Sequence, residues 1–297
     1  MRQAGGGGRG TLYVVATPIG NLGDMTPRGV RVLSEADMAA AEDTRHSRAL
    51  FAHFGIKTPL FSCHGHNEEK RGDFFIRALQ EGKSVALLSD AGTPCISDPG
   101  HRLIGQAAAA GIEIVPICGP SAVIAALSIS GLDASRFAFL GFWPRKKAEQ
   151  AAALEAIAAW GSPVAFYESP RRIAKTLLFL SESDPDMEIC LCNDLTKKFE
   201  RVYRGTPAEV AAQLAQNPAA EKGEYTCVAL PSRQAQKKEP PASTRGALSL
   251  EAQLVDIMAT EGCDLKTAAA RLHALAPKQR KKEIYAATLR VKAITAR

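Results

Sequence analysis

A polar loop of twelve residues, Ser89 to Gly100, holds the residue types best suited to chemistry in this chain. It follows the apolar run Val85 to Leu88, so we expect it at the end of a strand and before an alanine-rich helix. Gly92 and Gly100 allow backbone conformations that other residues avoid, and two prolines fix φ. Connections between strands and helices usually span about 2 to 6 residues, so the length favours a ligand-binding loop over a plain turn, which stays the alternative.

Three further polar loops follow predicted strands, at residues 17–24, 42–46 and 118–122. The carboxyl ends of parallel strands share one edge of a sheet, so these loops should meet the first loop at a single crevice, where we expect the active site. Gly119 and Ser121 stand at a helix start that can offer N–H groups to a carboxylate or a phosphate. Ser121 can equally serve as the cap of that helix.

The predicted crevice is richer in carboxylates than in lysine, through Glu42, Asp43, Asp90 and Asp98. These groups suit a cationic or hydroxyl-rich ligand better than a triphosphate, although each can instead be a helix cap or a salt-bridge partner. The chain lacks a Walker lysine, and its glycine run at residues 5–10 precedes the first predicted strand instead of following it. Both features disfavour an ATPase and a nicotinamide-dependent enzyme.

The elements that must position these loops alternate between strand and helix patterns, which is typical of a mostly parallel α/β sheet. We predict strands at residues 11–17, 38–41, 60–63, 84–89 and 112–117, with helices at 27–34, 45–54, 68–80, 99–110 and 121–129. Four pairs each supply an N-cap and a proline at the first helical position: Thr26-Pro27, Asp98-Pro99, Ser169-Pro170 and Thr206-Pro207.

A second, mixed α/β unit is predicted after a boundary near residue 135, with strands near 137–142, 164–167, 189, 202 and 225. Two or three short helices follow a segment of linker composition. The predicted organisation is a disordered tail at 1–10, α/β domains at 11–135 and 136–230, a linker at 231–249 and a basic helical RNA-binding extension at 250–297.

The basic excess of the chain lies at its end. Residues 233–297 hold 13 Lys and Arg against 6 Asp and Glu, whereas residues 1–232 hold 24 against 25. We expect this positive segment to contact RNA phosphates, although a solvated helix face is the plain alternative. The candidate contacts are Lys278, Arg280, Lys281 and Lys282.

No run of the sequence is long and apolar enough for a membrane span, and the start lacks the apolar segment of a signal peptide. We therefore expect a cytoplasmic protein without a membrane partner. Seven scattered cysteines without a C-x-x-C pair suggest neither a disulfide framework nor zinc. His64 and His66 lie two residues apart without an evident third ligand, so no metal is expected.

Several long motifs, in order along the chain, resemble the tetrapyrrole (corrin/porphyrin) methylase superfamily, and within it the ribosomal RNA small subunit methyltransferase I group. They are TPIGNLGD, AEDTRHS, SDAGTPCISDPG, GPSA, FYESPRR and KGEY. The resemblance implies two α/β domains with a cofactor cleft between them, and a homodimer that uses S-adenosyl-L-methionine. It also implies methylation of the ribose 2′-hydroxyl of a cytidine in the decoding centre of 16S rRNA, on free small-subunit rRNA or on the 30S subunit.

Matched residue by residue, the resemblance assigns cofactor contacts to both predicted domains. They are Ser89, Asp90, Ala91, Gly92, Thr93, Ile96, Ser121, Ala122, Phe166, Tyr167 and Glu168. The same match leaves three candidates for the base that takes the hydroxyl proton, and the sequence does not choose among them: Asp43, Glu42 and His66. Further RNA contacts are expected from Arg45, Asn67 and Arg171.

One segment departs from the group's pattern, because Asn193 stands where the group usually has arginine. A neutral donor replaces a planar, permanently charged one, which puts a phosphate contact there in doubt. Two alternatives to rRNA methylation stay open at this stage. One is methylation of a small tetrapyrrole, such as a precorrin, which has no need of the basic tail. The other is a non-catalytic ribosome-binding module, which has no use for the whole Ser89–Gly100 loop.

Overall fold

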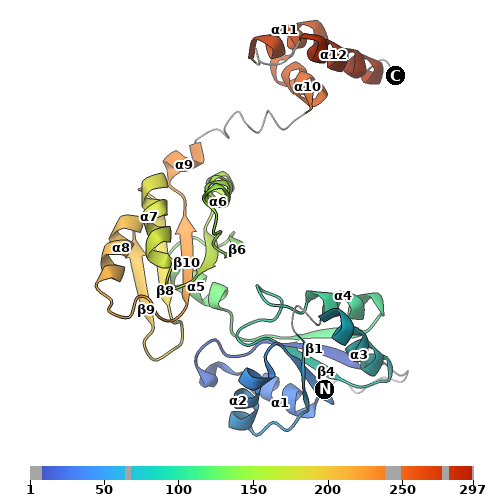
Figure 1. The fold of residues 1–297 in the computed structure, drawn as a ribbon, viewed down its shortest axis with the longest axis vertical. Coiled ribbons are helices and arrows are strands. Elements are labelled where there is room, and N and C mark those ends of the chain that lie inside the picture. Colours follow the sequence, from blue (N-terminus) through green and yellow to red (C-terminus); the bar gives the residue numbers. More distant parts are fainter. Residues whose placement is uncertain (1–8, 64–67, 238–248, 276–280, 296–297) are drawn as a thin grey trace. The chain divides into compact units, whose positions relative to one another are not determined.

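The computed structural model describes residues 9–63, 68–237, 249–275 and 281–295. The chain forms two compact units, Met1–Gln236 and Lys237–Arg297. The first unit contains two five-stranded sheets, and the second contains helices (Figure 1). Within the described ranges, no helix has the length and apolar character needed to cross a membrane.

The first sheet is parallel throughout and has the order β3-β2-β4-β1-β5. Its strands match the sequence prediction: β1 (Thr11–Val15), β2 (Met38–Ala41), β3 (Leu60–Ser62), β4 (Val85–Leu88) and β5 (Glu113–Ile117). Every residue of β2 and β4 is buried, because helices cover both faces of the sheet. These helices are α1 (Pro27–Glu35), α2 (Thr44–Phe54), α3 (Glu68–Gln80) and α4 (His101–Ala109), with the short 3-10 helix η1 (Leu22–Asp24) ahead of α1.

Alternating residues of the strands divide the core of this sheet into two layers. Leu12 packs with Phe75 of α3 and Leu103 of α4 on one face. Val15 packs with Leu33 of α1 and Phe51 of α2 on the other face. This two-sided burial leaves the carboxyl edge of the sheet, where the polar loops begin, as its ligand-accessible side.

The second sheet is mostly antiparallel and has the order β6-β7-β10-β8-β9, with only β6 and β7 parallel. Its strands are β6 (Ala138–Phe142), β7 (Val164–Glu168), β8 (Glu188–Asn193), β9 (Arg201–Gly205) and β10 (Tyr225–Leu230). One face carries a core of Trp143, Phe166, Leu177 and Val210. The helices packed there are α6 (Lys147–Trp160), α7 (Ile173–Ser183) and α8 (Pro207–Ala215).

Helix α5 (Ala122–Ser130) covers the opposite face of the second sheet, although it follows β5 of the first. Val123, Ala126 and Leu127 of this helix pack on Ala165 and Val228. The predicted boundary near residue 135 had grouped this helix with the first domain, whereas its packing joins it to the second sheet. The chain thus crosses between sheets before α5, and the start of α5 lies where the two sheets meet.

Two of the four predicted helix starts are confirmed. Thr26 accepts a hydrogen bond from the Gly29 N–H, and Thr206 forms a reciprocal capping box with Glu209. The predicted starts at Asp98-Pro99 and Ser169-Pro170 are wrong, because α4 begins at His101 and α7 at Ile173. The N-cap residues of these two helices are Gly100 and Arg172, so neither Asp98 nor Ser169 occupies an N-cap position. The Asp98 side chain instead lines a cavity beside the long loop.

The two ends of the predicted organisation need correction. Residues 1–8 lie outside the described residues, but Arg9 and Gly10 of the expected disordered tail are held on the first unit. The Gly10 N–H donates to the Leu79 carbonyl at 2.7 Å, and Arg9 donates to the Ala110 carbonyl at 2.6 Å. Inside the expected linker, the short helix α9 (Arg233–Lys237) forms. The helical unit that follows contains α10 (Leu250–Glu261), α11 (Leu265–Leu275) and α12 (Lys281–Thr295), packed around Leu254, Leu272 and Ile284.

Candidate functional site

Backbone and side-chain hydrogen bonds join the polar loops at the carboxyl edge of the first sheet. The N–H of Thr17 donates to the Gly92 carbonyl at 2.9 Å, and the N–H of Gly92 donates back to Thr17 at 3.0 Å. The Thr93 hydroxyl donates to the Pro120 carbonyl at 3.1 Å, and the Asp43 N–H donates to the Asp90 carboxylate at 3.1 Å. The predicted convergence of the four loops is therefore confirmed.

The Ser89–Gly100 loop is held in a strained conformation. Gly92 and Gly100 have φ values of +76° and +125°, and the non-glycine residues Cys95 and Ser97 have +68° and +69°. Strain of this kind persists only where the surroundings fix it, and it concentrates at binding and catalytic sites. At Gly92 the requirement is conformational, since an added Cβ would make ordinary contacts with Ile19 at 3.4 Å and the Pro120 carbonyl at 3.9 Å.

A cavity of about 340 Å³ lies beside this loop within the first unit. Its lining comes from the long loop, from the start of α5 and from the strand ends of the second sheet. The lining residues are Ile19, Ala91, Gly92, Thr93, Ile96, Ser97, Asp98, Ser121, Ala122, Phe142, Tyr167, Glu168, Ser169, Pro170 and Gly223 to Thr226. The volume falls in the range of small-molecule sites, about 300 to 1,000 Å³.

Eight of the residues assigned to the cofactor by resemblance line this cavity: Ala91, Gly92, Thr93, Ile96, Ser121, Ala122, Tyr167 and Glu168. Ser89 and Asp90 line a neighbouring cavity instead. Phe166 lines neither, because successive side chains of a strand point to opposite faces and its ring packs on Trp143 at a centroid distance of 4.7 Å.

The cavity has an aromatic wall, of which sequence reasoning found Tyr167 but missed Phe142. Phe142 is 62% exposed although it is a large apolar residue, and its ring lies 5.5 Å from that of Tyr167. Phe139 packs on the other side of Tyr167 at 5.1 Å. The parallel pairing of β6 with β7 sets Phe142 opposite Tyr167 at the carboxyl ends of both strands, and no local sequence pattern signals this tertiary feature. Such a wall suits a flat, apolar ring.

The start of α5 provides a polar end to the cavity. The Ser121 side chain makes no capping hydrogen bond within the described structure, so the alternative in which this hydroxyl caps α5 is wrong. The first N–H groups of a helix have no intrahelical acceptor, and together with the helix dipole they favour an anion. A ligand carboxylate beside Ser121 would satisfy them.

Asp98 supplies a carboxylate within the same cavity. Burial raises the pKa of Asp98 to about 6, and the nearby charges of Glu42 and Asp90 add to this effect. A carboxylate surrounded by others favours a cationic ligand, which lowers the electrostatic cost of ionising it. Burial, helped by the charges of Asp98 and Glu224, also raises the pKa of Tyr167 to about 12, so its hydroxyl stays protonated at neutral pH.

Glu168 lines the cavity, but its carboxylate is already engaged by protein groups. It accepts hydrogen bonds from the Thr176 hydroxyl at 2.7 Å and the Ser169 N–H at 2.6 Å, and it pairs with Arg172 at 3.1 Å. Arg172 also donates to the carbonyls of Trp143 and Pro144. Glu168 therefore holds the Ser169–Pro170 wall in place, and the neighbouring Arg171 is left exposed to solvent.

The candidate bases and RNA contacts at the sheet edge differ in their surroundings. Asp43 caps α2 and pairs with Arg45 at 2.7 Å, and this interaction lowers the pKa of Asp43 to about 2. A carboxylate with so low a pKa is a poor proton acceptor near neutral pH. Glu42 lies close enough to Asp98 to raise its pKa. His66 and Asn67 lie outside the described residues.

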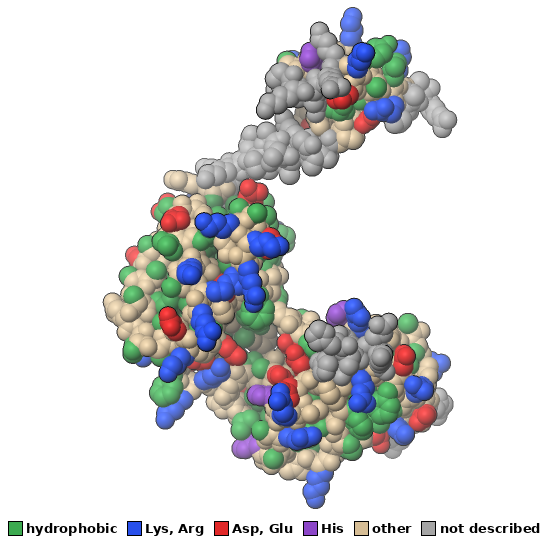
Figure 2. Space-filling model, viewed as in Figure 1, with side chains coloured by type: hydrophobic (Ala, Val, Ile, Leu, Met, Phe, Trp, Pro, Cys, Tyr) green, Lys and Arg blue, Asp and Glu red, His purple; other side chains and the backbone are tan. Residues whose placement is uncertain are grey.

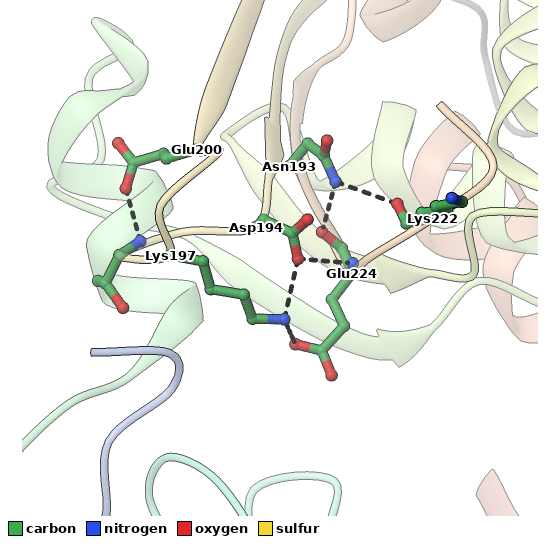
Figure 3. Close-up of polar contacts among 7 residues, drawn as sticks. Asn193, Asp194, Lys197, Glu200, Lys222 and Glu224 are labelled. Atoms are coloured by element: carbon green, nitrogen blue, oxygen red, sulfur yellow. Dashed lines mark hydrogen bonds and ion pairs between the residues drawn. The ribbon is translucent and has the colours of Figure 1, made fainter. Parts of the chain in front are cut away.

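The departure at Asn193 has a structural explanation (Figure 3). Asn193 is buried at the end of β8, and its amide lies 3.5 Å from the Lys222 carbonyl and 3.4 Å from the Glu224 carbonyl. These contacts tie β8 to the segment before β10, so the Asn193 amide serves the fold. Among the described residues, no group of three or more His, Cys, Asp or Glu is arranged to hold a metal ion.

In the helical unit, the structure describes only part of the predicted RNA surface. Lys278 and Arg280 lie outside the described residues, as does the side chain of Lys281, while Lys282 is exposed near the start of α12. Sequence reasoning missed a groove of about 740 Å³ between α11 and α12, whose lining includes Lys266, Lys292 and Tyr285. The sequence gives little sign of this groove, because its lining residues come from two helices whose packing no local pattern predicts.

The comparison with protein families fits this geometry. Residues 11–211 match the family described as Tetrapyrrole (Corrin/Porphyrin) Methylases, a stretch that includes the long loop, the start of α5 and the aromatic wall. The chain belongs to the tetrapyrrole methylase family and is a methyltransferase that uses S-adenosyl-L-methionine.

The names of similar proteins point to a more specific activity than the family name does. The chain is 48% identical over 222 residues to the ribosomal RNA small subunit methyltransferase I of Pseudomonas aeruginosa, covering 74% of this chain and 78% of that one. It is 40% identical over 254 residues to the enzyme of the same name from Escherichia coli O157:H7, covering 84% and 87%.

Two solved structures share the fold at low sequence identity. Diphthine synthase has a TM-score of 0.57 at 16% identity, covering 74% of this chain and 90% of that one. Cobalt precorrin-4 methyltransferase has 0.56 at 18%, covering 77% and 96%. These likenesses confirm the predicted pair of α/β sheets.

The residues of the cavity fit S-adenosyl-L-methionine. Phe142 and Tyr167 would hold the adenine ring, the start of α5 at Ser121 would hold the methionine carboxylate, and Asp98 would face the sulfonium charge. When bound there, the cofactor supplies an electrophilic methyl group. The protein's part is to bind it, to orient it and to exclude water around it.

The raised pKa of Asp98 predicts that cofactor affinity depends on pH. Only the ionised carboxylate attracts the sulfonium, so calorimetry should show the affinity falling by about tenfold from about pH 7.5 to about pH 5. S-adenosylhomocysteine, which lacks the sulfonium charge, should show a smaller change, and Asp98→Asn should flatten the profile. An equal pH dependence in Asp98→Asn would remove Asp98 from the site.

The same group makes a prediction about stability, with the opposite sign. A pKa raised in the folded state means that the folded state binds the proton more tightly than the unfolded chain does. The stabilisation is fully present below about pH 3.8 and is lost as the pH rises through about 6. Thermal unfolding of the cofactor-free chain should show Asp98→Asn to be relatively more stable above that window.

Proposed function

We propose that this chain transfers a methyl group from S-adenosyl-L-methionine to the ribose 2′-oxygen of a cytidine in the decoding centre of 16S rRNA, in free rRNA or in the 30S subunit. The observation that carries the proposal is the 40–48% identity to enzymes named for small-subunit rRNA methylation, over 74–84% of the chain. The cavity supports it with a site for the methyl donor. A cytoplasmic location follows from the proposed substrate.

Transfer to an oxygen depends chiefly on holding donor and acceptor in line, with a base needed only as the hydroxyl proton leaves. The rigid long loop, tied to Thr17, gives one wall of that geometry. The low pKa of Asp43 argues for a positioning role, in which it holds Arg45 at the rim, 85% exposed. Glu42 and His66 stay our candidates for the base, and Arg45, Asn67 and Arg171 for RNA contacts at this rim.

The helical unit is proposed to bind RNA phosphates. Lys266 and Lys292 line the groove between α11 and α12 with Tyr285, which is 67% exposed and offers a surface for a base to stack on. Lys and Arg side chains are spread over the face of this unit seen in Figure 2. Arg271 and Arg290 pair with Glu261 and Glu251, so they are less available to RNA.

A homodimer is proposed as the working form. Strand β6 lies at the edge of the second sheet and exposes Phe137 beside it, together with Leu140 on the strand. Edge strands with exposed apolar side chains are prone to pair with another chain, and natural proteins usually cover them. A second copy of this chain is the cover that we propose.

The proposed reaction is tested by mapping ribose methylation in 16S rRNA from cells with and without this protein. We expect one methylated cytidine to disappear without the protein and to return with the parent chain. Gly92→Val should not restore it, because the strain of a branched residue at a φ of +76° would distort the loop that forms the cavity wall.

The matched control is Gly55→Val, since Gly55 has a similar φ of +67° at the end of α2 but faces open space. It should restore methylation. An unchanged methylation map in cells lacking the protein would contradict the proposed function.

Removal of the helical unit should separate RNA binding from cofactor binding. A chain ending at Gln236 keeps the cavity and the hydrogen bond from the Ser232 N–H to Asp184, so its cofactor affinity should stay within about twofold. Its affinity for 16S rRNA should fall, and the slope of binding against salt should become shallower as fewer counterions are released. Parental affinity and slope in the shortened chain would exclude the tail as an RNA site.

A further inference from the structure

A second cavity, of about 330 Å³, adjoins the cofactor cavity at the same sheet edge. The two cavities share Ile19, Ala91 and Glu224 as common wall. The second one is otherwise lined by the β1 loop, by α2 and by the first residues of the long loop. The polar groups that it gathers are Thr17, His46, Ser47, Ser89, Asp90 and Lys197.

Lys197 enters this cavity from the loop between β8 and β9, which is strained. Asp194 and Thr196 have φ values of +52° and +66°, and the non-glycine residues with positive φ in the described chain all lie in this loop or in the Ser89–Gly100 loop. The carbon chain of Lys197 packs against Gly20, where a Cβ would come within 2.4 Å of it. The strained loop therefore aims Lys197 at the β1 loop.

The ammonium group of Lys197 is held in a fixed position (Figure 3). It donates to the Asp194 carboxylate at 2.9 Å and to the Glu224 carboxylate at 3.0 Å. Burial disfavours its charge, but the hydrogen bonds to Asp194 and Glu224, together with the negative charges of these two carboxylates, outweigh burial and raise the pKa of Lys197. An ammonium group has three N–H donors, so one remains for a ligand after the two carboxylates are served.

The charge around Lys197 selects the kind of ligand. One cation faces Asp194, Glu224 and Asp90, so the surroundings are negative overall and disfavour a phosphate. The Thr17 and Ser47 hydroxyls donate to the Ser89 and Asp43 carbonyls, so toward a ligand they act as acceptors. Together with the His46 imidazole they suit a neutral molecule rich in hydrogen-bonding groups. A nucleoside, with its ribose hydroxyls and its base edge, has this chemistry.

We propose that the second cavity binds the acceptor nucleoside of the RNA and that Lys197 is a positioning residue that donates to a ribose oxygen. The inference rests on the proposed function and adds the substrate subsite to it. Methyl transfer needs donor and acceptor held close together and in line, and two adjoining cavities that share Ile19, Ala91 and Glu224 place them side by side. A nucleoside reaching this cavity must be unstacked from its neighbours, as enzymes that modify single nucleotides commonly require.

The test blocks the cavity from α2. Ala49 lines the cavity and is exposed, so Ala49→Trp fills the space without entering the core. Ala52 is also exposed and lies one helical turn further on, outside the lining, so Ala52→Trp is the matched control. Ligand-detected NMR with cytidine, on the full chain loaded with S-adenosylhomocysteine, should show binding to the parent and to Ala52→Trp and none to Ala49→Trp.

Methyl transfer to 30S subunits is measured with the same proteins. Ala49→Trp should lose at least about tenfold in kcat/KM with cofactor affinity within about twofold, and Ala52→Trp should match the parent. Cytidine binding that survives in Ala49→Trp, or parental kcat/KM in it, would overturn the subsite and leave the proposed function intact. Cytidine bound in the cavity without any transfer to rRNA would contradict the proposed function and support the subsite.

Lys197 is tested by Lys197→Met, which keeps the length of the carbon chain and removes the donor. Lost positioning should lower kcat by about tenfold while the KM for 30S subunits and the cofactor affinity hold, because other contacts bind both. Lys197→Arg should recover part of the rate. A parallel loss of cofactor affinity and melting temperature in Lys197→Met would mean that the ion pairs only hold the loop, and it would overturn the positioning role.

Discussion

The pair of backbone hydrogen bonds between Thr17 and Gly92 is the constraint on which the site depends. Thr17 is buried, and Gly92 can accept the pairing only because glycine tolerates a φ of +76°. This pairing joins the end of β1 to the long loop after β4, and the Thr17 hydroxyl adds a hydrogen bond to the Ser89 carbonyl. The loop is thereby held in a conformation that it would not keep alone, with its cavity wall formed before any ligand arrives.

The passage of the chain from one sheet to the other brings the remaining parts to this wall. Because α5 packs on the second sheet while its first turn follows β5, the N–H groups near Ser121 open into the cavity. The carboxyl ends of β6 and β7 add Phe142 and Tyr167. A flat ring, a carboxylate and a cation thus each meet a matching group, which is the set of features that S-adenosyl-L-methionine presents.

Much of this could be predicted from the sequence, and the exceptions have physical causes. The apolar runs of β2 and β4 and the caps at Thr26 and Thr206 are local signals, and they were confirmed. The cap predicted at Asp98 was wrong because α4 begins at His101 after Gly100, while the Asp98 side chain lines the cavity, an effect of tertiary structure. Phe142 and Lys197 belong to the second sheet, and their approach to the first depends on the path of α5, which no local pattern encodes. His66, Asn67, Lys278 and Arg280 stay predictions.

The central claim is that one preformed cavity between the long loop, α5 and the second sheet binds the methyl donor. A crystal structure of the full chain with S-adenosylhomocysteine tests it most directly. We expect the adenine beside Phe142 and Tyr167, and the carboxylate at the start of α5 near Ser121, with the Thr17–Gly92 pairing unchanged. Ligand density in the cavity lined by Ala49 and Lys197, or away from Gly92 altogether, would contradict the account.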